Sequence, residues 1–514
     1  MSLWVCVISM SQSSLGCVYN DGLCASLSER AKINRLDERD VSLHVSMASD
    51  LIPGIDLNTV IFDTYGYVQN STNIVKQVMD SGFRRIYFDV YYDSVNSDWH
   101  MCPYRPPNGT FYNTTSVKLP NNIVCDYSLG VDQLLAAIKE YINLSDTNIA
   151  ASIIYIHIRP KIWSSTISNS TIVPSSISSL NATFTNSLSQ RILTPSFLAS
   201  YQSSGKLVTT DGVSPDTPRN MQWPTLQTSI YTTLRRIVVS YDNDLSYIPD
   251  VQYLEYVAFP HSVTVEDPSS YTIEDLSLRN FTDTFVQTAT QWEEAKSLGI
   301  SPVFNATIDV YGQDFAALVE YYGFWAWAPD EPVLYSIAER EYMLRDGFSQ
   351  SQNFDACAVV TASGLKVANC NSHFQCLCKN RKNSFDWRFS EDNHTYFDNS
   401  CPKGYSFSVP SSALEMRYVK SLMQEKEVDI VWADFNSLFL PNCWVSGGTE
   451  AVCPYNVYED DRNGVGFIAV SCAICFACLV FIFYFEWDRR HSSLMKKRSL
   501  KGQKQCNEYE GVPS

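Results

Sequence analysis

The chain has 514 residues, of which 45% are hydrophobic and 18% are charged. This composition can bury a core, so it excludes a wholly disordered protein. The net charge is −17, although the last 27 residues hold seven Lys or Arg against three Asp or Glu. An acidic body repels the phosphate backbone, so direct binding to nucleic acid is not expected.

The first segment, residues 1–25, would carry the signal sequence of a secreted or membrane protein. Its apolar stretch, Leu3 to Ile8, is short, and no Lys or Arg precedes it. Such a start is atypical of signal sequences, which usually combine a basic end with a longer apolar run. The expectation of a signal sequence therefore depends on the features of the remaining chain.

Helix-like and strand-like segments alternate from residue 38 to residue 322. The spacing of apolar residues predicts helices over 71–81, 132–142 and 283–298, and strands over 84–92, 151–158 and 300–310. This alternation is typical of α/β proteins with a parallel sheet, and the available length fits a TIM-type barrel. Residues 164–189 are rich in Ser and Thr, and we expect a solvated, glycosylated excursion from the barrel there.

A cysteine-rich region follows over residues 323–453. Seven of the 16 cysteines lie between Cys357 and Cys453, which predicts a small disulfide-stabilised α+β module in an oxidising compartment. A helix is expected over 412–425 and a strand over 428–433. Zinc is the alternative for Cys370, Cys376 and Cys378, but their spacing matches no common zinc site. We therefore expect neither a metal nor another cofactor.

Residues 464–485 form a run of 22 residues without a charge. A helix of this length reaches about 33 Å, which matches the hydrocarbon core of a bilayer. Acidic residues precede the run and basic residues follow it, so the positive-inside rule places the tail, residues 486–514, in the cytoplasm. The sequence thus predicts a single-pass type I membrane protein, with its N-terminal body in the lumen or outside the cell.

Nine Asn-x-Ser/Thr sequons precede the predicted span, and none follows it. Each is a candidate for N-glycosylation on the lumenal side. They are Asn70, Asn108, Asn113, Asn143, Asn169, Asn181, Asn280, Asn305 and Asn393. Cys102 and Cys125 stand apart from the other cysteines, and we expect them to pair.

The segment IPGIDL, Ile52 to Leu57, followed by a helix and GFRRIYFDVYYD, Gly82 to Asp93, resembles the start of a phosphatidylinositol-phospholipase-like barrel. In that superfamily, two histidines act as general base and general acid. The first has no counterpart here, because no His lies between His44 and His100. Asp89, His100 and His157 are therefore weak catalytic candidates, and for Asp89 we favour an ordinary carboxylate near a strand end.

The segment WAWAPDEP, Trp325 to Pro332, with the cysteines that follow it, is similar to the end of a C-type lectin module. The similarity implies a disulfide between Cys357 and Cys370. The calcium ligands of that module are replaced by Lys366-Val367-Ala368, so calcium-dependent sugar binding does not carry over. We expect a disulfide-stapled cap.

These motifs occur in one order along nearly all of residues 38–490, ending in CPKGYSFSVP, VWADFN and the apolar run. The whole arrangement resembles the fungal family named maintenance of telomere capping protein 6. The resemblance implies a single-pass type I membrane glycoprotein and brings no biochemical activity with it. Any link to telomeres would be indirect, because a lumenal body cannot touch chromosome ends.

Three functions follow from these observations. The leading one is a non-catalytic membrane glycoprotein of the secretory pathway, with the bilayer and an unknown lumenal ligand or protein as partners. The first alternative is a divergent phosphodiesterase acting on a phosphoinositide or glycerophosphodiester. The second is a carbohydrate-binding receptor, in which the aromatic residues Trp325 to Trp327 form a stacking platform.

Overall fold

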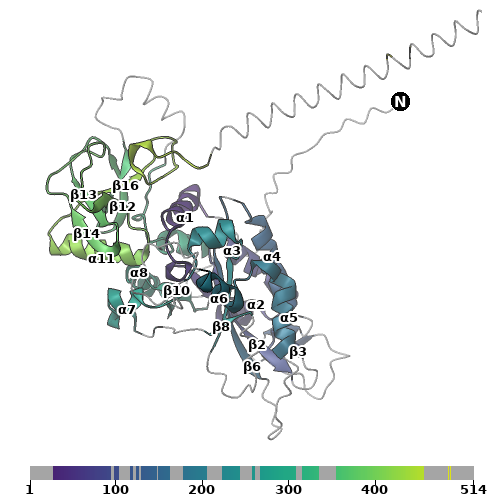
Figure 1. Cartoon of the computed structure of the whole chain (residues 1–514). Coiled ribbons are helices and arrows are strands. Elements are labelled where there is room, and N and C mark those ends of the chain that lie inside the picture. Colours follow the sequence, from purple (N-terminus) through teal and green to yellow (C-terminus); the bar gives the residue numbers. More distant parts are fainter. Residues whose placement is uncertain are drawn as a thin grey trace, which may run out of the picture. The chain divides into compact units, whose positions relative to one another are not determined.

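The computed structural model describes residues 27–93, 98–103, 116–119, 123–126, 129–147, 149–162, 177–204, 223–242, 257–260, 265, 267–307, 315–334 and 355–455, together with Tyr484 and Trp487. The chain divides into two units, Met1–Val452 and Cys453–Ser514. Both large sheets lie in the first unit (Figure 1). The expected signal sequence and nearly all of the expected membrane span and tail fall outside the described residues. Within those residues, no helix is both long and apolar enough to cross a membrane.

Seven parallel strands form the barrel sheet. They are β1 (Gly54–Asp56), β2 (Arg85–Asp93), β6 (Ile154–Ile162), β7 (Ile237–Tyr241), β8 (Phe259–Pro260), β9 (Asp283–Val286) and β10 (Ser301–Phe304), in the spatial order β8-β7-β6-β2-β1-β10-β9. The last strand, β10, pairs with the first, β1, as in a closed barrel. Within the described residues, β8 and β9 remain unpaired with one another, so the sheet is an open, partial barrel.

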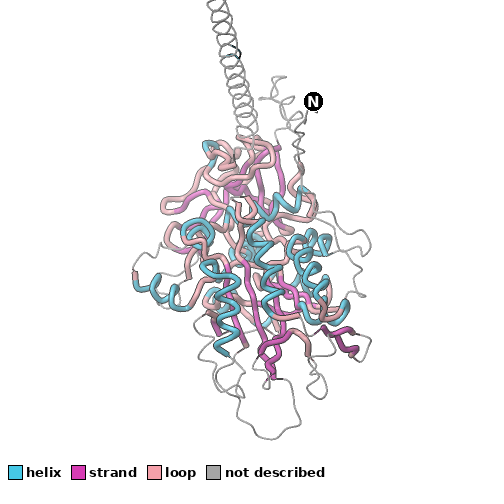
Figure 2. The backbone as a smooth tube through the Cα atoms, turned by 90° about the vertical axis from the view of Figure 1, so that its right-hand side faces the viewer, coloured by secondary structure: helices cyan, strands magenta, loops and turns pink. Residues whose placement is uncertain are grey.

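Helices cover the outer face of this sheet (Figure 2). The helices of the barrel region are α1 (Glu29–Val41), α2 (Asp63–Tyr65), α3 (Gln69–Asp80), α4 (Val131–Leu144), α5 (Ile177–Leu188), α6 (Pro195–Ser203), α7 (Ile273–Ser277), α8 (Ala289–Ser297) and α9 (Phe315–Tyr322). Apolar residues three and four apart on α3 and α4 are buried against Ile86, Phe88 and Val90 of β2 and against alternate isoleucines of β6. Side chains alternate along a strand. The residues of β2 and β6 that lie between these apolar residues therefore point to the inside of the barrel.

A short strand, β3 (Asp98–His100), pairs antiparallel with β2, and a two-stranded sheet is formed by β4 (Ser116–Lys118) and β5 (Val124–Asp126). The disulfide Cys102–Cys125 joins the segment after β3 to β5, which is the expected pairing.

Two expectations for the barrel region are wrong. Residues 283–286 form strand β9 rather than the start of a helix, because the helix begins only at α8, where the Thr288 side chain caps the amide of Gln291. The range 164–189 is not wholly a solvated excursion, because residues 177–188 form α5. Leu180, Phe184 and Leu188 recur every four residues along α5 and are buried.

The cysteine-rich region forms a mixed six-stranded sheet. Its strands are β11 (Asp355–Thr361), β12 (Gly364–Asn369), β13 (Gln375–Asn380), β14 (Asn383–Phe389), β15 (Tyr405–Phe407) and β16 (Val431–Asn436), with helix α11 (Ala413–Glu425) packed against it. Disulfides join Cys357 to Cys370, as expected, and Cys378 to Cys401. Because Cys370 and Cys378 are in disulfides, the zinc alternative for these cysteines is excluded.

Helix α1 connects the barrel to the cysteine-rich module through hydrogen bonds. Two consecutive amides, of Trp325 and Ala326, donate to the Glu38 carboxylate, and the indole Nε1 of Trp327 donates to Asp37 at 2.9 Å. Trp325 and Trp327 are only 5% and 4% exposed as a result. The expected aromatic stacking platform is therefore wrong, because these rings belong to the core of the module.

The same contact predicts an unusual dependence of stability on pH. Burial raises the pKa of Glu38 from 4.5 to about 8 and that of the nearby Asp50 from 3.8 to about 7, against the opposing effects of backbone hydrogen bonds and nearby cations. Because the unfolded chain ionises these groups first, the free energy of unfolding should fall as the pH rises from about 4 to about 8. At about 1.4 kcal/mol per unit of pKa shift, each of the two groups should contribute several kcal/mol.

Denaturant titrations of the full-length protein at several pH values would measure this change. Glu38→Gln, which keeps the accepting oxygen, should make the pH profile less steep and leave the contribution of Asp50, and Glu29→Gln on the exposed side of α1 should leave the profile unchanged. A wild-type profile that rises over this pH range would contradict the assignment.

Candidate site at the carboxyl edge of the barrel

Charged side chains gather around the carboxyl end of β1, beside the middle of β2 and the second half of β6. Asp56 is the last residue of β1, Asp89 lies on β2, and Arg159 and Lys161 lie two residues apart on β6. The register pairs Asp89 with Arg159 across neighbouring parallel strands. The carboxyl edge is where TIM-type barrels place their functional residues, so these four side chains are the candidate site.

Arg159 lies between the two carboxylates and binds both. Its Nη1 and Nη2 donate to the two oxygens of Asp56 at 2.7 and 2.8 Å, and its Nε donates to Oδ1 of Asp89 at 2.5 Å. Lys161 and the hydroxyl of Tyr91 donate to the other oxygen of Asp89. The two carboxylates and the two cations therefore neutralise one another within the site.

A second set of side chains holds this cluster in place. The amide of Asn58 donates to Asp56 at 3.1 Å, and its side-chain oxygen accepts from the amide of Asp89 at 2.7 Å. The side-chain nitrogen of Asn58 donates to Tyr67, whose hydroxyl donates to Asp63. Asn58 thus joins the end of β1 to the middle of β2.

The electrostatics favour a permanently charged Arg159. Burial by itself would lower the pKa of this guanidinium, but the hydrogen bonds and charges of Asp56 and Asp89 outweigh burial and raise it. Asp63, at the rim, behaves differently, because burial raises the pKa of its carboxyl and the hydrogen bond from Tyr67 opposes that shift only in part. Arg159 is therefore charged near neutral pH.

The candidate residue His157 lies deeper in the barrel, on β6. Its Nδ1 is 2.8 Å from Oγ of Ser240, and its Nε2 is 2.9 Å from Oδ1 of Asp242. These are the residue types of a nucleophilic triad, yet Ser240 and His157 are each only 1% exposed. A hydroxyl that substrate cannot reach does not act as a nucleophile, so we interpret this group as a satisfied part of the core.

The structure brings only one of the three weak catalytic candidates into the cluster. Asp89 is part of it, His157 lies in the layer below, and His100 lies on β3 opposite Tyr91. Asp56, Arg159 and Lys161 were not expected from the sequence as site residues. The signal for the last two was the alternation of charged and apolar residues in IYIHIRPKI, in which every second residue faces the barrel interior.

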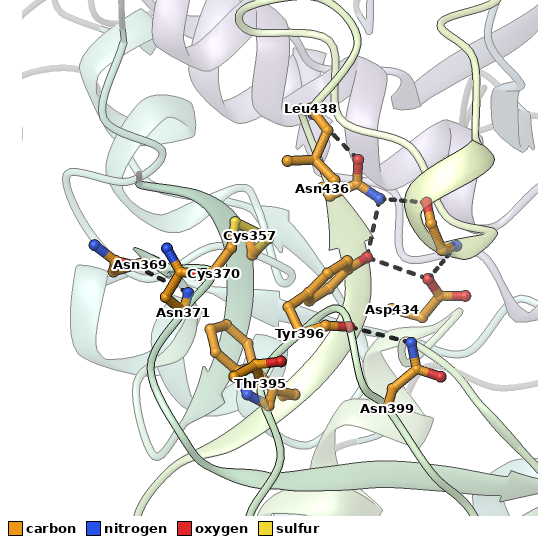
Figure 3. The surroundings of a disulfide bond; sticks show 12 residues. Cys357, Asn369, Cys370, Asn371, Thr395, Tyr396, Asn399, Asp434, Asn436 and Leu438 are labelled. Carbon is orange, nitrogen blue, oxygen red and sulfur yellow. Dashed lines mark hydrogen bonds between the residues drawn. A yellow bond between two sulfur atoms is a disulfide. The ribbon is translucent and has the colours of Figure 1, made fainter. Parts of the chain in front are cut away.

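The cysteine-rich module has its own buried polar group (Figure 3). The amides of Gly447 and Gly448 donate to the Asp434 carboxylate, the Tyr396 hydroxyl lies between Asp434 and Asn436, and the disulfide Cys357–Cys370 lies nearby. Burial raises the pKa of Asp434, and these donors offset only part of the shift. Because Asp434 is engaged by internal donors, we interpret this group as structural.

Six of the nine predicted glycosylation sites have described side chains. Asn70, Asn143 and Asn393 are exposed, and Asn181, Asn280 and Asn305 are half-buried. Asn108, Asn113 and Asn169 lie outside the described residues.

A family model described as the MTC6 partial TIM-barrel domain matches residues 25–325, more than half of the chain. The chain belongs to the MTC6 family. Two MTC6 relatives, both named maintenance of telomere capping protein 6, come from Meyerozyma guilliermondii and Candida tropicalis. Each is 27% identical over 93% of this chain and 94% of its own length.

Among solved structures, this MTC6 chain is similar to a calcium-dependent phosphoinositol-specific phospholipase C from a Pseudomonas species. The TM-score is 0.32 and the sequence identity 13%, and the match covers 54% of this chain and 94% of that one. L. pealei PLC21 matches with a TM-score of 0.24 and 12% identity, over 50% of this chain and 26% of that one.

Proposed function

We propose that this protein is a non-catalytic, single-pass membrane glycoprotein of the secretory pathway, whose barrel and cysteine-rich module form its lumenal part. The observation that supports the absence of catalysis is the double engagement of Arg159 by Asp56 and Asp89. The oxygens of these carboxylates already accept from an internal cation, so a substrate or a metal ion would have to compete with that cation for them.

The hydrogen bonds of these two carboxylates support the same proposal. Among the described residues, the groups that donate to Asp56 and Asp89 are Arg159, Lys161, Tyr91 and the amide of Asn58, so no imidazole takes part. General acid–base cleavage of a phosphodiester near neutral pH needs a group that exchanges a proton in that range. Permanently charged arginine does not do so.

The membrane part of the proposal rests on the uncharged run over residues 464–485 and the basic residues behind it. The relatives are named for telomere capping, and we propose that any such effect of this protein is indirect. A body in the lumen has no contact with chromosome ends, and its acidic charge does not favour nucleic acid. Its partners would be the bilayer, through one helix, and a lumenal ligand or protein.

Protease protection of the full-length protein in sealed microsomes tests this topology. We expect external protease to remove only about 3 kDa, the cytoplasmic tail, from the chain of 58.2 kDa, and endoglycosidase to increase the mobility of the protected fragment. Detergent should abolish the protection. Digestion of the whole body by external protease, with no change of mobility after endoglycosidase, would refute the topology.

A further inference from the structure

A groove lies at the end of the barrel opposite to the candidate site. Its volume is about 410 Å³, which is within the range of pockets that hold small ligands. The ends of α4 and α5 and the segment before β7 line it, and the lining includes Ile142, Asn143, Leu188, Arg191 and Leu234. Its place at the amino-terminal edge of the strands separates it from the chemistry at the carboxyl edge.

Leu234 is unusual in two respects. Its side chain is 53% exposed, and its backbone φ is +57°, in the left-handed region that bulky L-residues rarely adopt. From an exposed leucine held in this backbone conformation at the groove, we infer a surface that is normally covered.

Asn143 is the residue to which a group covering the groove would be attached. It is exposed, lines the groove and begins the sequon Asn143-Leu144-Ser145 in the last turn of α4. The buried Arg236 stabilises this turn, because it donates to the carbonyl oxygens of Ile142 and Ser145 and to the Ser145 hydroxyl. The position of Asn143 beside the groove is therefore fixed by the core.

Arg191, which lines the groove, has a hydrogen-bond donor without a partner among the described residues. The Nη2 of Arg191 donates to Asp146 at 2.6 Å, whereas its Nη1 is buried and has no hydrogen-bond partner among the described residues. A buried donor without a partner is costly, so its presence in a groove indicates an acceptor on whatever occupies that groove. An acetamido oxygen or a hydroxyl of a sugar is such an acceptor.

We propose that Asn143 carries an N-linked glycan whose first N-acetylglucosamine lies in this groove, with its apolar face over Leu234 and its acetamido oxygen accepting from Arg191. The attachment rests on the proposed function, since it requires a lumenal body. The Asn143 amide nitrogen forms a bond to the anomeric carbon of a lipid-diphosphate-linked oligosaccharide. The carbon–oxygen bond to the diphosphate breaks, and the amide proton leaves with the lipid diphosphate.

The test uses full-length protein made in a eukaryotic secretory host. An endoglycosidase that cleaves between the two core N-acetylglucosamines is applied to the native and the denatured protein, and glycopeptide mass spectrometry follows release at Asn143 and at Asn70. We expect release at Asn143 to be about tenfold slower than at Asn70 in the native protein and equal after denaturation. Leu234→Ser should remove most of this difference, and Ile149→Ser, an equally exposed position outside the groove lining, should leave it unchanged.

Two results would overturn the inference and leave the proposed function standing. One is an unoccupied Asn143 in a protein that is glycosylated at Asn70 or Asn393. The other is native release at Asn143 as fast as at Asn70. A protein that carries no glycan at any sequon would instead defeat the proposed function together with this inference.

Discussion

Arg159→Met is expected to lower the free energy of unfolding by about 3–5 kcal/mol. The substitution leaves Asp56, which is almost fully buried, without the cation that binds both of its oxygens, while Asp89 keeps Lys161. A buried carboxylate without a partner must remain charged at high cost or take up a proton. Denaturant unfolding of the full-length protein in detergent would measure the loss.

Two further variants separate the loss of charge pairing from the loss of packing. Asp56→Asn combined with Arg159→Met should recover a large part of the stability, because it removes the unpaired charge. Arg30→Met breaks an exposed ion pair with Asp330 and should cost at most about 1 kcal/mol. If Arg159→Met cost no more than Arg30→Met, the carboxylates would not depend on Arg159, and the account of the site would be wrong.

Asp283→Leu is expected to have an effect of similar size in the layer beneath. Asp283, on β9, accepts from Arg85 and from the hydroxyl of Tyr87, and all three side chains are buried inside the barrel. Burial by itself would lower the pKa of Arg85, but the charge of Asp283 and the hydroxyls of Tyr87 and Tyr155 together outweigh burial and raise it. Without Asp283, the guanidinium is buried and unpaired, so about 3–5 kcal/mol of stability should be lost.

Combining Arg85→Met with Asp283→Leu should restore most of that stability, because well-packed apolar residues often replace a buried ion pair without loss. Glu140→Leu, which breaks an exposed pair with Lys76, serves as the control and should change stability by at most about 1 kcal/mol. The measurement is again the free energy of unfolding. A double variant as unstable as Asp283→Leu alone would show that the charges do not act as a pair.

The sequence predicted those barrel elements whose apolar periodicity is strong. The strand expected over 84–92 is β2, and the helices expected over 71–81 and 132–142 are α3 and α4, because their buried residues recur at spacings of two and of three to four. Strands β1 and β9 have three and four residues. A strand this short has too few residues to show a period, and it exists because its neighbours in the sheet pair with it.

The candidate site was harder to predict, since it depends on register. Asp56 and Arg159 are separated by 103 residues, and only the parallel pairing of β1, β2 and β6 brings them together. The expected aromatic platform is wrong because of burial rather than register. Trp325 and Trp327 look like surface-binding residues in the sequence, but contacts with α1 draw them into the core.

Hydrolysis assays test the central claim most directly. Full-length wild-type protein, a variant combining Asp56→Asn with Asp89→Asn, and protein-free detergent would be incubated with phosphatidylinositol and with glycerophosphodiesters, with and without calcium, over pH 5–8. We expect product formation by the wild-type protein to equal that of the variant and of the protein-free control in every condition. Turnover by the wild-type protein that the double substitution abolishes would contradict the claim that these carboxylates serve only to hold Arg159.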